Sequence, residues 1–586
     1  MSEKIFPFLR WVRGYRRSDL NNDMIAATVV AIMIIPQGMA YAMLAGLPPQ
    51  AGLYGAVLPL LIYAAFGSSP SLAVGPVAVV ALMTAAAAGN VAQDGGPEFQ
   101  LAALWLALLS GAMLFAMGIL RLGFIASFLS HPVISGFITS AGLLIAASQL
   151  RHLLGADIGG RTVLEIVPSL MRNIASPSWP TLALSALTLG FLIWSRTGIA
   201  RLLQRLGLGA PLARLLGKTG LLIAVAGTTL AVWLFGLQAQ GVAVLGEVPR
   251  GLPQFGMPAV DLTLIQLLAA PALMIALVGY VESISIAQTL AARKRQSLDP
   301  DRELIALGLS NLGAGVSSAM PVTGGLSRSI VNYDAGAATP AAGAFTALLV
   351  GIALLALTPL MFHLPRATLA AIIVVAVLSL LDFRALPRTW AYSKADGAAM
   401  AATMGVTLFV GVEPGLLAGV GLSLVLYLYR TSRPHMAVVG QVAGTEHFRN
   451  IERHAVVTDP EVFSIRVDES LYFPNARALE DRIVQALSET PGLRHVVLQA
   501  TAINYIDASA LESLEAINDR LHAAGVQFHL SEVKGPVMDQ LQRSHLLGDL
   551  TGQVFLTQFD AMQALAPRIT EACLRTERCD TLLARP

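Results

Sequence analysis

The stretch PVTGGLSR at residues 321–328 decides the fold, because proline and glycine interrupt an otherwise apolar part of the chain there. It predicts an extended run that passes into a short helix, with Arg328 one turn into that helix. The stretch SLAVGPV at residues 71–77 has the same form in the first half of the chain. Paired interrupted segments at matching positions are typical of membrane proteins built from inverted repeats. Two ordinary kinked helices are the alternative interpretation.

The composition of the chain favours a bilayer environment. Hydrophobic residues make up 55% of the 586 residues, charged residues only 13%, and the mean hydropathy is +0.65. An ordinary soluble chain carries about 25% charged residues, so much of the usual polar surface is missing. The net charge of +2 gives no indication of a nucleic-acid partner. The two cysteines, Cys573 and Cys579, lie in no metal-ligand pattern, and we expect neither a metal nor a cofactor.

Fourteen apolar segments precede a change of composition near residues 430–434. A transmembrane helix needs about 20 apolar residues, and several of the segments are shorter than that. An even number of segments suggests two halves of seven. The segments lie at 24–43, 53–66, 75–89, 99–119, 125–149, 180–194, 219–236, 264–290, 303–319, 324–334, 342–360, 367–383, 397–411 and 414–430.

The charges between these segments predict the orientation in the membrane. With the N-terminus inside, the cytoplasmic regions, one of which runs from Arg196 to Lys218, carry 20 Lys and Arg residues and the outside loops five. This bias follows the positive-inside rule, so we expect both termini in the cytoplasm and the chain in the inner (plasma) membrane. The predicted parts are a basic amphipathic segment at 1–20, a membrane domain at 21–432, a cytoplasmic domain at 433–566 and a loosely ordered tail at 567–586.

Two helix starts that face each other within a membrane form an anion pocket. The first N–H groups of a helix lack intrahelical partners and lie at the positive end of the helix dipole, so the backbone alone can bind an anion. Pro76 suits the first turn of such a helix, and Gly75, Gly324 and Gly325 let the backbone approach a ligand. Arg328 adds a full positive charge, and an arginine within a span is functional by default. A structural ion pair is the alternative.

Polar side chains in two other segments are candidates for the same pocket. Glu282 lies deep in segment 264–290, where it can couple transport to H⁺ or Na⁺ or act as a structural counter-ion to Arg328. Gln37 follows a proline in the first segment and offers donor and acceptor groups. Tyr41 lies one turn later on the same helix face. We expect Gln37 and Tyr41 to line the pocket, with helix packing as the alternative.

The motifs around these residues resemble those of the SulP (sulfate permease) family. ELIALGLSN at 303–311 is similar to the family's E-L-x-A-x-G-x-x-N run, and PVTGGLSRS at 321–329 resembles its tenth-segment signature, including the arginine. The matches extend over roughly residues 20–340 in order and spacing. In the first half they are PQGMAYA at 36–42, GLPP at 46–49, GLY at 52–54, YAAFGSS at 63–69 and VGP at 74–76.

The resemblance implies an α-helical membrane domain of 14 segments in a seven-plus-seven inverted repeat, with core and gate domains and an elevator-like movement. It also implies a homodimer and a substrate held between the third and tenth segments. Four residues after Glu282, where Na⁺-coupled members carry a hydroxyl, this chain has Ile286; Ser283 or Ser285 can substitute, and we take Ser285 as a second coupling-ion candidate. The substrate-binding candidates are Gln37, Tyr41, Gly75, Pro76, Val77, Thr323, Gly324, Gly325, Leu326, Ser327 and Arg328.

After about residue 435 the chain alternates between strand and helix patterns. VFSIRV at 462–467 alternates like a strand, and the whole pattern predicts a small α/β sheet with helices on one face. It resembles a STAS domain, and YFPNA at 472–476 is similar to the form fused to SulP transporters. Ser509 matches the turn where bacterial STAS proteins can carry a phosphorylated serine. An ordinary helix cap made by Asp507 or Ser509 is the alternative.

These features together predict secondary active transport of a small anion. Sulfate, bicarbonate, chloride and dicarboxylates all suit a pocket of helix N-termini and one arginine, and H⁺ or Na⁺ are the candidate coupling ions. The alternative is a membrane anion sensor that signals through its STAS domain without net flux. We do not expect an enzyme, because no nucleophile, base and orienting group occur together among the segments.

Overall fold

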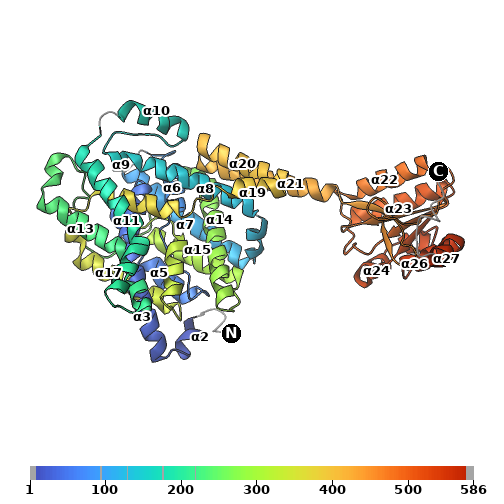
Figure 1. Cartoon of the computed structure of the whole chain (residues 1–586), viewed down its shortest axis with the longest axis horizontal. Helices are drawn as coiled ribbons and strands as arrows, with labels where there is room; N and C mark the ends of the chain where they lie inside the picture. The colour runs from blue at the N-terminus through green and yellow to red at the C-terminus, as the bar shows by residue number, and fades with distance from the viewer. Residues whose placement is uncertain (1–7, 93–95, 129, 175–176, 218, 576–586) are drawn as a thin grey trace. The chain divides into compact units, whose positions relative to one another are not determined.

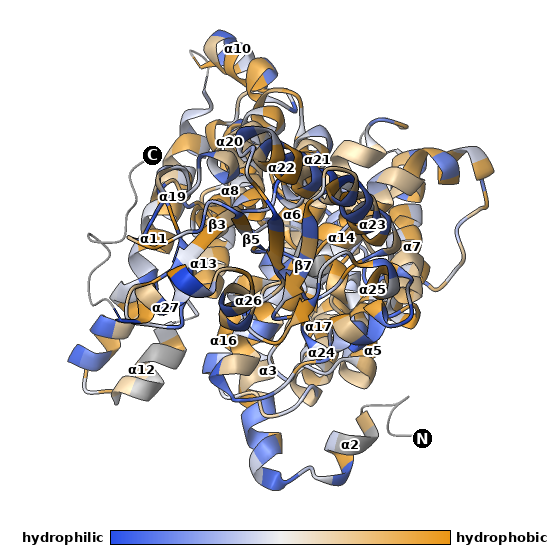
Figure 2. Cartoon of the chain, turned by 90° about the vertical axis from the view of Figure 1, so that its right-hand side faces the viewer, coloured by the Kyte–Doolittle hydropathy of each residue, from blue (hydrophilic) through white to orange (hydrophobic). Residues whose placement is uncertain are grey.

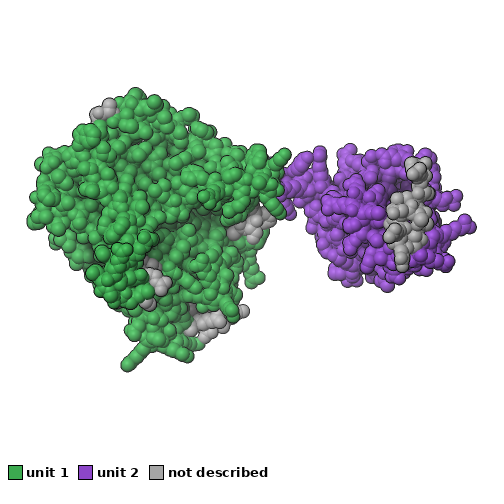
Figure 3. All heavy atoms as spheres, in the orientation of Figure 1, with its two compact units in different colours: residues 1–423 green, residues 424–586 purple. Residues whose placement is uncertain are grey.

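The computed structural model describes residues 8–92, 96–128, 130–174, 177–217 and 219–575. The chain forms a membrane unit and a smaller C-terminal unit (Figure 1). Figure 3 colours them as residues 1–423 and 424–586. The division falls within helix α21 (Val412–Ser432), a few residues before the boundary predicted from composition. The predicted N-terminal segment contains α2 (Phe8–Arg13), and its first seven residues lie outside the described residues.

Helices of the membrane unit lie on all fourteen predicted segments. Seven are long and apolar enough to span a bilayer by length and composition, counted over the described residues, and the rest are shorter. In chain order they are α3 (Arg17–Leu44), α4 (Pro49–Tyr54) with α5 (Leu58–Phe66), α6 (Ala78–Ala88), α7 (Pro97–Ile119), α8 (His131–Ser148), α11 (Trp179–Arg205), α13 (Gly220–Leu234), α14 (Leu262–Arg293), α15 (Pro300–Val316), α16 (Leu326–Asp334), α17 (Ala341–Ala356), α18 (Arg366–Leu378), α20 (Lys394–Phe409) and α21.

These helices pack as two bundles, the core and gate of the seven-plus-seven inverted repeat. The core bundle contains α3, α5, α6, α7, α14, α15, α16 and α17, and the gate bundle contains α8, α11, α13, α18 and α20. Helix α18 contacts α3 of the core, and so does α13. Close approach of small residues is the usual way membrane helices pack. Gly111 on α7 and Gly308 on α15 follow this rule, because a Cβ on either would meet the backbone of the facing helix.

The predicted cytoplasmic region from Arg196 to Lys218 begins within a helix, because helix α11 continues to Arg205. Arg196 therefore projects from a helix of the gate bundle. The apolar run ends at Trp194, but the helix continues beyond it because arginine has a high helix propensity.

The C-terminal unit is a six-stranded sheet in the order β4-β3-β5-β6-β7-β8. Strands β5 to β8 are parallel, and β3 pairs antiparallel with β4 and β5. In Figure 2 the strands β5 and β7 carry hydrophobic colour, while α22 and α23 carry hydrophilic residues as well. The strands are β3 (Met436–Gln441), β4 (Phe448–Asn450), β5 (Val462–Val467), β6 (His495–Gln499), β7 (Gln527–Ser531) and β8 (Val554–Phe555).

Helices cover both faces of this sheet, so the expectation of helices on one face is wrong. Val496 and Leu498 of β6 pack with α22 (Ala476–Glu489) and α23 (Ala508–Ala523). Val497 points to the other face, where it packs with Met562 of α26 (Gln558–Leu565). Near α23 the first face also meets α24 (Gly535–Leu541) and α25 (Leu546–Asp549).

The predicted tail begins with a helix instead of a loosely ordered segment. Helix α27 (Pro567–Arg575) buries Cys573 against Val457, and the carbonyl of Cys573 accepts a hydrogen bond from the Gly444 N–H at 2.9 Å. Residues 576–586, including Cys579, lie outside the described residues. The polar composition of the segment concealed one apolar helix face, which packs against Val457 and Ala443.

A buried histidine makes the C-terminal unit sensitive to acid. The Gln553 N–H donates to Nδ1 of His529 at 2.9 Å, so the neutral ring carries its proton on Nε2 and donates to Nδ1 of His495 at 3.2 Å. Burial, together with the neighbouring His495, lowers the pKa of His529 to about 4. Protonation of Nδ1 would remove the hydrogen bond from Gln553.

The C-terminal unit is therefore expected to lose stability as the pH falls from about 6.5 to about 4. The unfolded chain, with a histidine pKa of about 6.5, binds a proton in this range that folded His529 does not, at about 1.4 kcal/mol per pH unit. The loss approaches about 3 kcal/mol at pH 4. Calorimetry of the full chain should show the corresponding fall in the unfolding temperature of this unit. The fall should be smaller in His529→Gln and unchanged in the exposed-site control His447→Gln.

Candidate functional site

Two very short strands pair with each other within the core bundle. Strand β1 (Val74–Gly75) pairs antiparallel with β2 (Thr323–Gly324), with Val74 opposite Gly324 and Gly75 opposite Thr323. Helix α6 begins two residues after Pro76, and α16 begins at Leu326. Both interrupted segments thus pass from strand to half-helix at the same place. We had predicted Pro76 in the first turn of this helix. It lies instead one residue before the N-cap residue Val77.

Side chains of three helices hold the strand pair in position. Asn311 of α15 forms two hydrogen bonds with Val322, accepting from its N–H at 2.9 Å and donating to its carbonyl at 2.8 Å. Ser283 of α14 accepts from the Gly324 N–H at 2.8 Å and lies 2.6 Å from the Thr323 hydroxyl. Ser329 of α16 accepts from the Ala73 N–H at 2.9 Å. These roles could not be predicted from the sequence, because each depends on which helices become neighbours.

A buried carboxylate fixes the segment that leads into β1. Glu303 of α15 is fully buried and accepts hydrogen bonds from Tyr63 at 2.8 Å and from the Ser68 hydroxyl and N–H at 2.6 and 3.0 Å. A buried charge is tolerated only where hydrogen bonds satisfy it. Glu303 therefore holds the turn between α5 and β1, and through it the start of α6.

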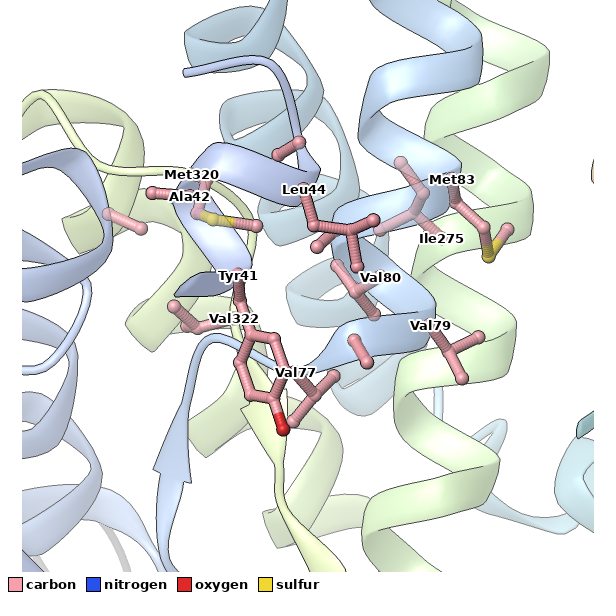
Figure 4. Close-up of a cluster of buried hydrophobic side chains, with 14 of the residues drawn as sticks. Tyr41, Ala42, Leu44, Val77, Val79, Val80, Met83, Ile275, Met320 and Val322 are labelled. Atoms are coloured by element: carbon pink, nitrogen blue, oxygen red, sulfur yellow. The ribbon is translucent and has the colours of Figure 1, made fainter. Parts of the chain in front are cut away.

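The two half-helix starts open into one cavity between the core bundle and α18. Its volume is about 310 Å³. Gly75, Pro76, Thr323 and Gly324 lie in or beside the strand pair and do not line this cavity. Figure 4 shows the Tyr41 ring beside Val77, where β1 passes into α6. The predicted residues that line the cavity are Gln37, Tyr41, Val77, Gly325, Leu326, Ser327, Arg328 and Glu282.

Arg328 is the buried cation of this cavity. Its side chain is 2% exposed, and its Nε and Nη2 atoms are buried without a hydrogen-bond partner among the described residues. A Cβ on Gly325 would lie 2.7 Å from Nη2, and one on Gly75 would lie 3.3 Å from it. These glycines thus make room for the guanidinium, whereas the sequence analysis assigned the room to a ligand. Buried charged donors require an acceptor, and the cavity beside them has room for one.

The backbone donors that remain for an anion lie in the first turns of α6 and α16. The N–H of Gly324 is taken by Ser283, and that of Gly325 donates to the Ala73 carbonyl at 3.0 Å. The Thr323 hydroxyl donates to the Gly279 carbonyl at 2.5 Å. The next N–H groups along each helix have no acceptor within their own helix. The residues that carry these groups, Leu326 and Ser327 on α16 with Ala78 and Val79 on α6, line the cavity.

The two coupling-ion candidates lie in different places. Glu282 is half-buried and lines the cavity with Arg328. The Ser285 hydroxyl donates to the Val281 carbonyl at 2.7 Å, and its side chain lines another cavity with Gln288 and Asp301. The structure therefore does not bring Ser285 to the cavity that Arg328 lines. Ser283, two residues earlier on α14, faces the strand pair instead.

Two protein-family profiles match the chain, one over the membrane unit and one over the C-terminal unit. The profile of the sulfate permease family matches residues 20–403, which include both half-helices and their strands. This chain belongs to that family. The STAS domain profile matches residues 453–561, so the C-terminal unit is a STAS domain. As a member of the family, the chain is an anion transporter and not an enzyme.

Relatives of this family member are similar over nearly its whole length. The protein named "Sulfate transporter 4.1, chloroplastic" of Arabidopsis thaliana is 36% identical over 579 residues, which cover 96% of this chain and 82% of the relative. A "Probable sulfate transporter" of Mycobacterium tuberculosis is 33% identical over 560 residues, covering 95% and 97%. The solved structure of SLC26A9 superposes with a TM-score of 0.87 at 23% identity, covering 97% of this chain and 94% of that one. It shares the fold.

The STAS domain of this transporter places Ser509 at its surface. Asp507 is the N-cap of α23, since its side chain accepts from the Ala510 N–H at 2.8 Å and also from the Phe473 N–H at 2.9 Å. Ser509 is exposed in the first turn of that helix. The capping role thus belongs to Asp507, and phosphorylation of Ser509 stays a prediction.

Proposed function

We propose that this family member moves sulfate across the membrane by secondary active transport, with the ion held at the starts of α6 and α16. The observation that carries the proposal is Arg328, whose buried Nε and Nη2 have no hydrogen-bond partner among the described residues and lie beside the first turns of two helices. Sulfate offers four oxygens to such donors, and charged donors bind oxyanions strongly. The names of the relatives, which are sulfate transporters, support the choice of ion.

The proposed movement is an elevator-like shift of the core bundle against the gate bundle. The strand pair and both half-helices belong to the core, while α18 supplies the opposite wall of the cavity. A shift of the core along α18 would carry the site without rebuilding it, because Asn311, Ser283 and Glu303 are core residues too. We also propose a homodimer in the plasma membrane with both termini in the cytoplasm, as the positive-inside bias predicts.

Uptake by the purified full-length protein in proteoliposomes tests the proposal. Radiolabelled sulfate should accumulate, and unlabelled sulfate should compete better than bicarbonate, chloride or succinate. Stronger competition by another anion would assign the site to that anion. Binding of sulfate without counterflow would contradict transport and support the alternative of a sensor.

Glu282→Gln is expected to abolish accumulation against a gradient while leaving sulfate exchange measurable. The carboxyl lies in the same cavity as Arg328, so a proton or cation held there would travel with the anion, and glutamine binds neither. Uptake driven by a pH gradient and by a Na⁺ gradient should be measured for both proteins. The control is Glu98→Gln, an exposed acid in the first turn of α7. Full gradient-driven accumulation in Glu282→Gln would show that Glu282 does not couple transport.

A further inference from the structure

A second cavity adjoins the substrate cavity on the gate side. Its volume is about 410 Å³, and it is lined by residues of α3, α11, α13, α16 and α18. Gln37, Ser327 and Ser379 line both cavities. Ser327 precedes Arg328, so the second cavity begins directly beside the proposed anion site. An ion that leaves that site on this side must pass through it.

Arg196 of α11 supplies a positive charge to this second cavity. Its Nη2 atom donates to the Val375 carbonyl at 2.5 Å, in the last turn of α18. The residue is exposed, in contrast to the buried Arg328. The neighbouring Ala376 lines both cavities, so the hydrogen bond holds the guanidinium beside the wall that the two cavities share.

The hydrogen bond to Val375 shows that Arg196 has a structural role, but it leaves most of the guanidinium available. The Ser379 N–H donates to the carbonyl of Ala376 and not to that of Val375, which would be its usual partner in an α-helix. The Val375 carbonyl therefore accepts from Arg196. Capping a carbonyl needs a single donor. A guanidinium has five N–H groups in a planar fork that suits oxyanions, and its charge within a membrane protein is costly.

We propose that Arg196 is a second contact for the transported anion, a transient site on the path between the substrate cavity and the side toward which α11 and α18 end. This inference rests on the proposed function. The ligand class is the same, a small oxyanion such as sulfate. Arg328 belongs to the core bundle and Arg196 to the gate bundle. A shift of the core relative to the gate therefore changes the separation of the two charges, so Arg196 assists the ion in one position of the core only.

Binding of radiolabelled sulfate to the full-length protein tests this inference. Arg196→Gln retains a donor for Val375 but removes the charge, and should weaken binding about two- to fivefold at low ionic strength. The difference should shrink in about 300 mM potassium gluconate, because salt screens exposed charges. Arg196→Lys should bind nearly as the wild type does. Arg201→Gln removes the same charge from the same helix outside the cavity and should change nothing.

The outcomes separate the two proposals. Equal binding by the wild type and Arg196→Gln would overturn the second site while the proposed function stands. A loss in Arg196→Gln that is independent of salt and accompanied by a lower Tm would also overturn it, because that pattern marks the helix cap alone. If the wild type binds no sulfate, the proposed function fails and this inference fails with it.

Discussion

Arg328→Gln is expected to weaken sulfate binding by about a hundredfold or more. The buried Nε and Nη2 atoms have no partner among the described residues, so each can form a charge-assisted hydrogen bond to the anion. Such bonds contribute about 1.5–3 kcal/mol each, and two of them correspond to about two to four orders of magnitude in affinity. Binding and uptake of radiolabelled sulfate by full-length protein measure the effect.

The stability of Arg328→Gln distinguishes loss of the site from misfolding. Removing a buried charge that has no hydrogen-bond partner in the described part of the chain relieves a desolvation cost, so the Tm in the absence of sulfate should stay equal or rise. The Tm increase that sulfate gives the wild type should vanish, since a ligand stabilises only a protein that binds it. Arg366→Gln, an exposed arginine bonded to the Val244 carbonyl, is the matched control. Unchanged affinity in Arg328→Gln would remove this residue from the site.

The positions of the membrane elements could be predicted from the sequence because one physical requirement dominates there. A bilayer demands long apolar helices with satisfied backbones, so hydropathy marks α3 and α14, and proline with glycine marks the breaks before α6 and α16. The cavity lining at Gln37, Tyr41 and Arg328 followed from polar residues in apolar runs. Such residues are rare enough to identify.

Roles that depend on a partner from another helix could not be predicted. Asn311 and Ser283 are ordinary polar residues in the sequence, and only the packing of α14 and α15 shows that they hold β2. Ser285 shares its helix with Ser283, yet it lines another cavity. Arg196 was predicted only as one charge of a cytoplasmic region, and its hydrogen bond to Val375 of α18 depends on the packing of α11 against α18. Spacing along one helix does not determine which neighbour a side chain meets.

Gly52→Ala is expected to be the most destabilising of these changes. A Cβ on Gly52 of α4 would lie far closer to the Gly38 carbonyl than the 3.0 Å that real Cβ atoms keep. The obstacle is backbone, which cannot rotate away as a side chain can. Overpacking of this kind costs about 1–3 kcal/mol where side chains yield, so a loss of about 3 kcal/mol is a reasonable minimum here. Thermal unfolding of the purified full-length protein measures it.

The same substitution should reach the anion site through α3. Gly38 follows Gln37 directly, so separating α4 from α3 moves Gln37 and Tyr41 relative to the cavity. Gly38→Ala is the graded comparison, because its Cβ would lie 3.1 Å from the Gly52 carbonyl oxygen and needs only a small adjustment. Gly405→Ala on α20 meets no atom within 4 Å and should gain about 0.5–1 kcal/mol from helix propensity. Equal Tm values for Gly52→Ala and Gly405→Ala would contradict the close crossing of α3 and α4, and with it the placement of Gln37 in the cavity.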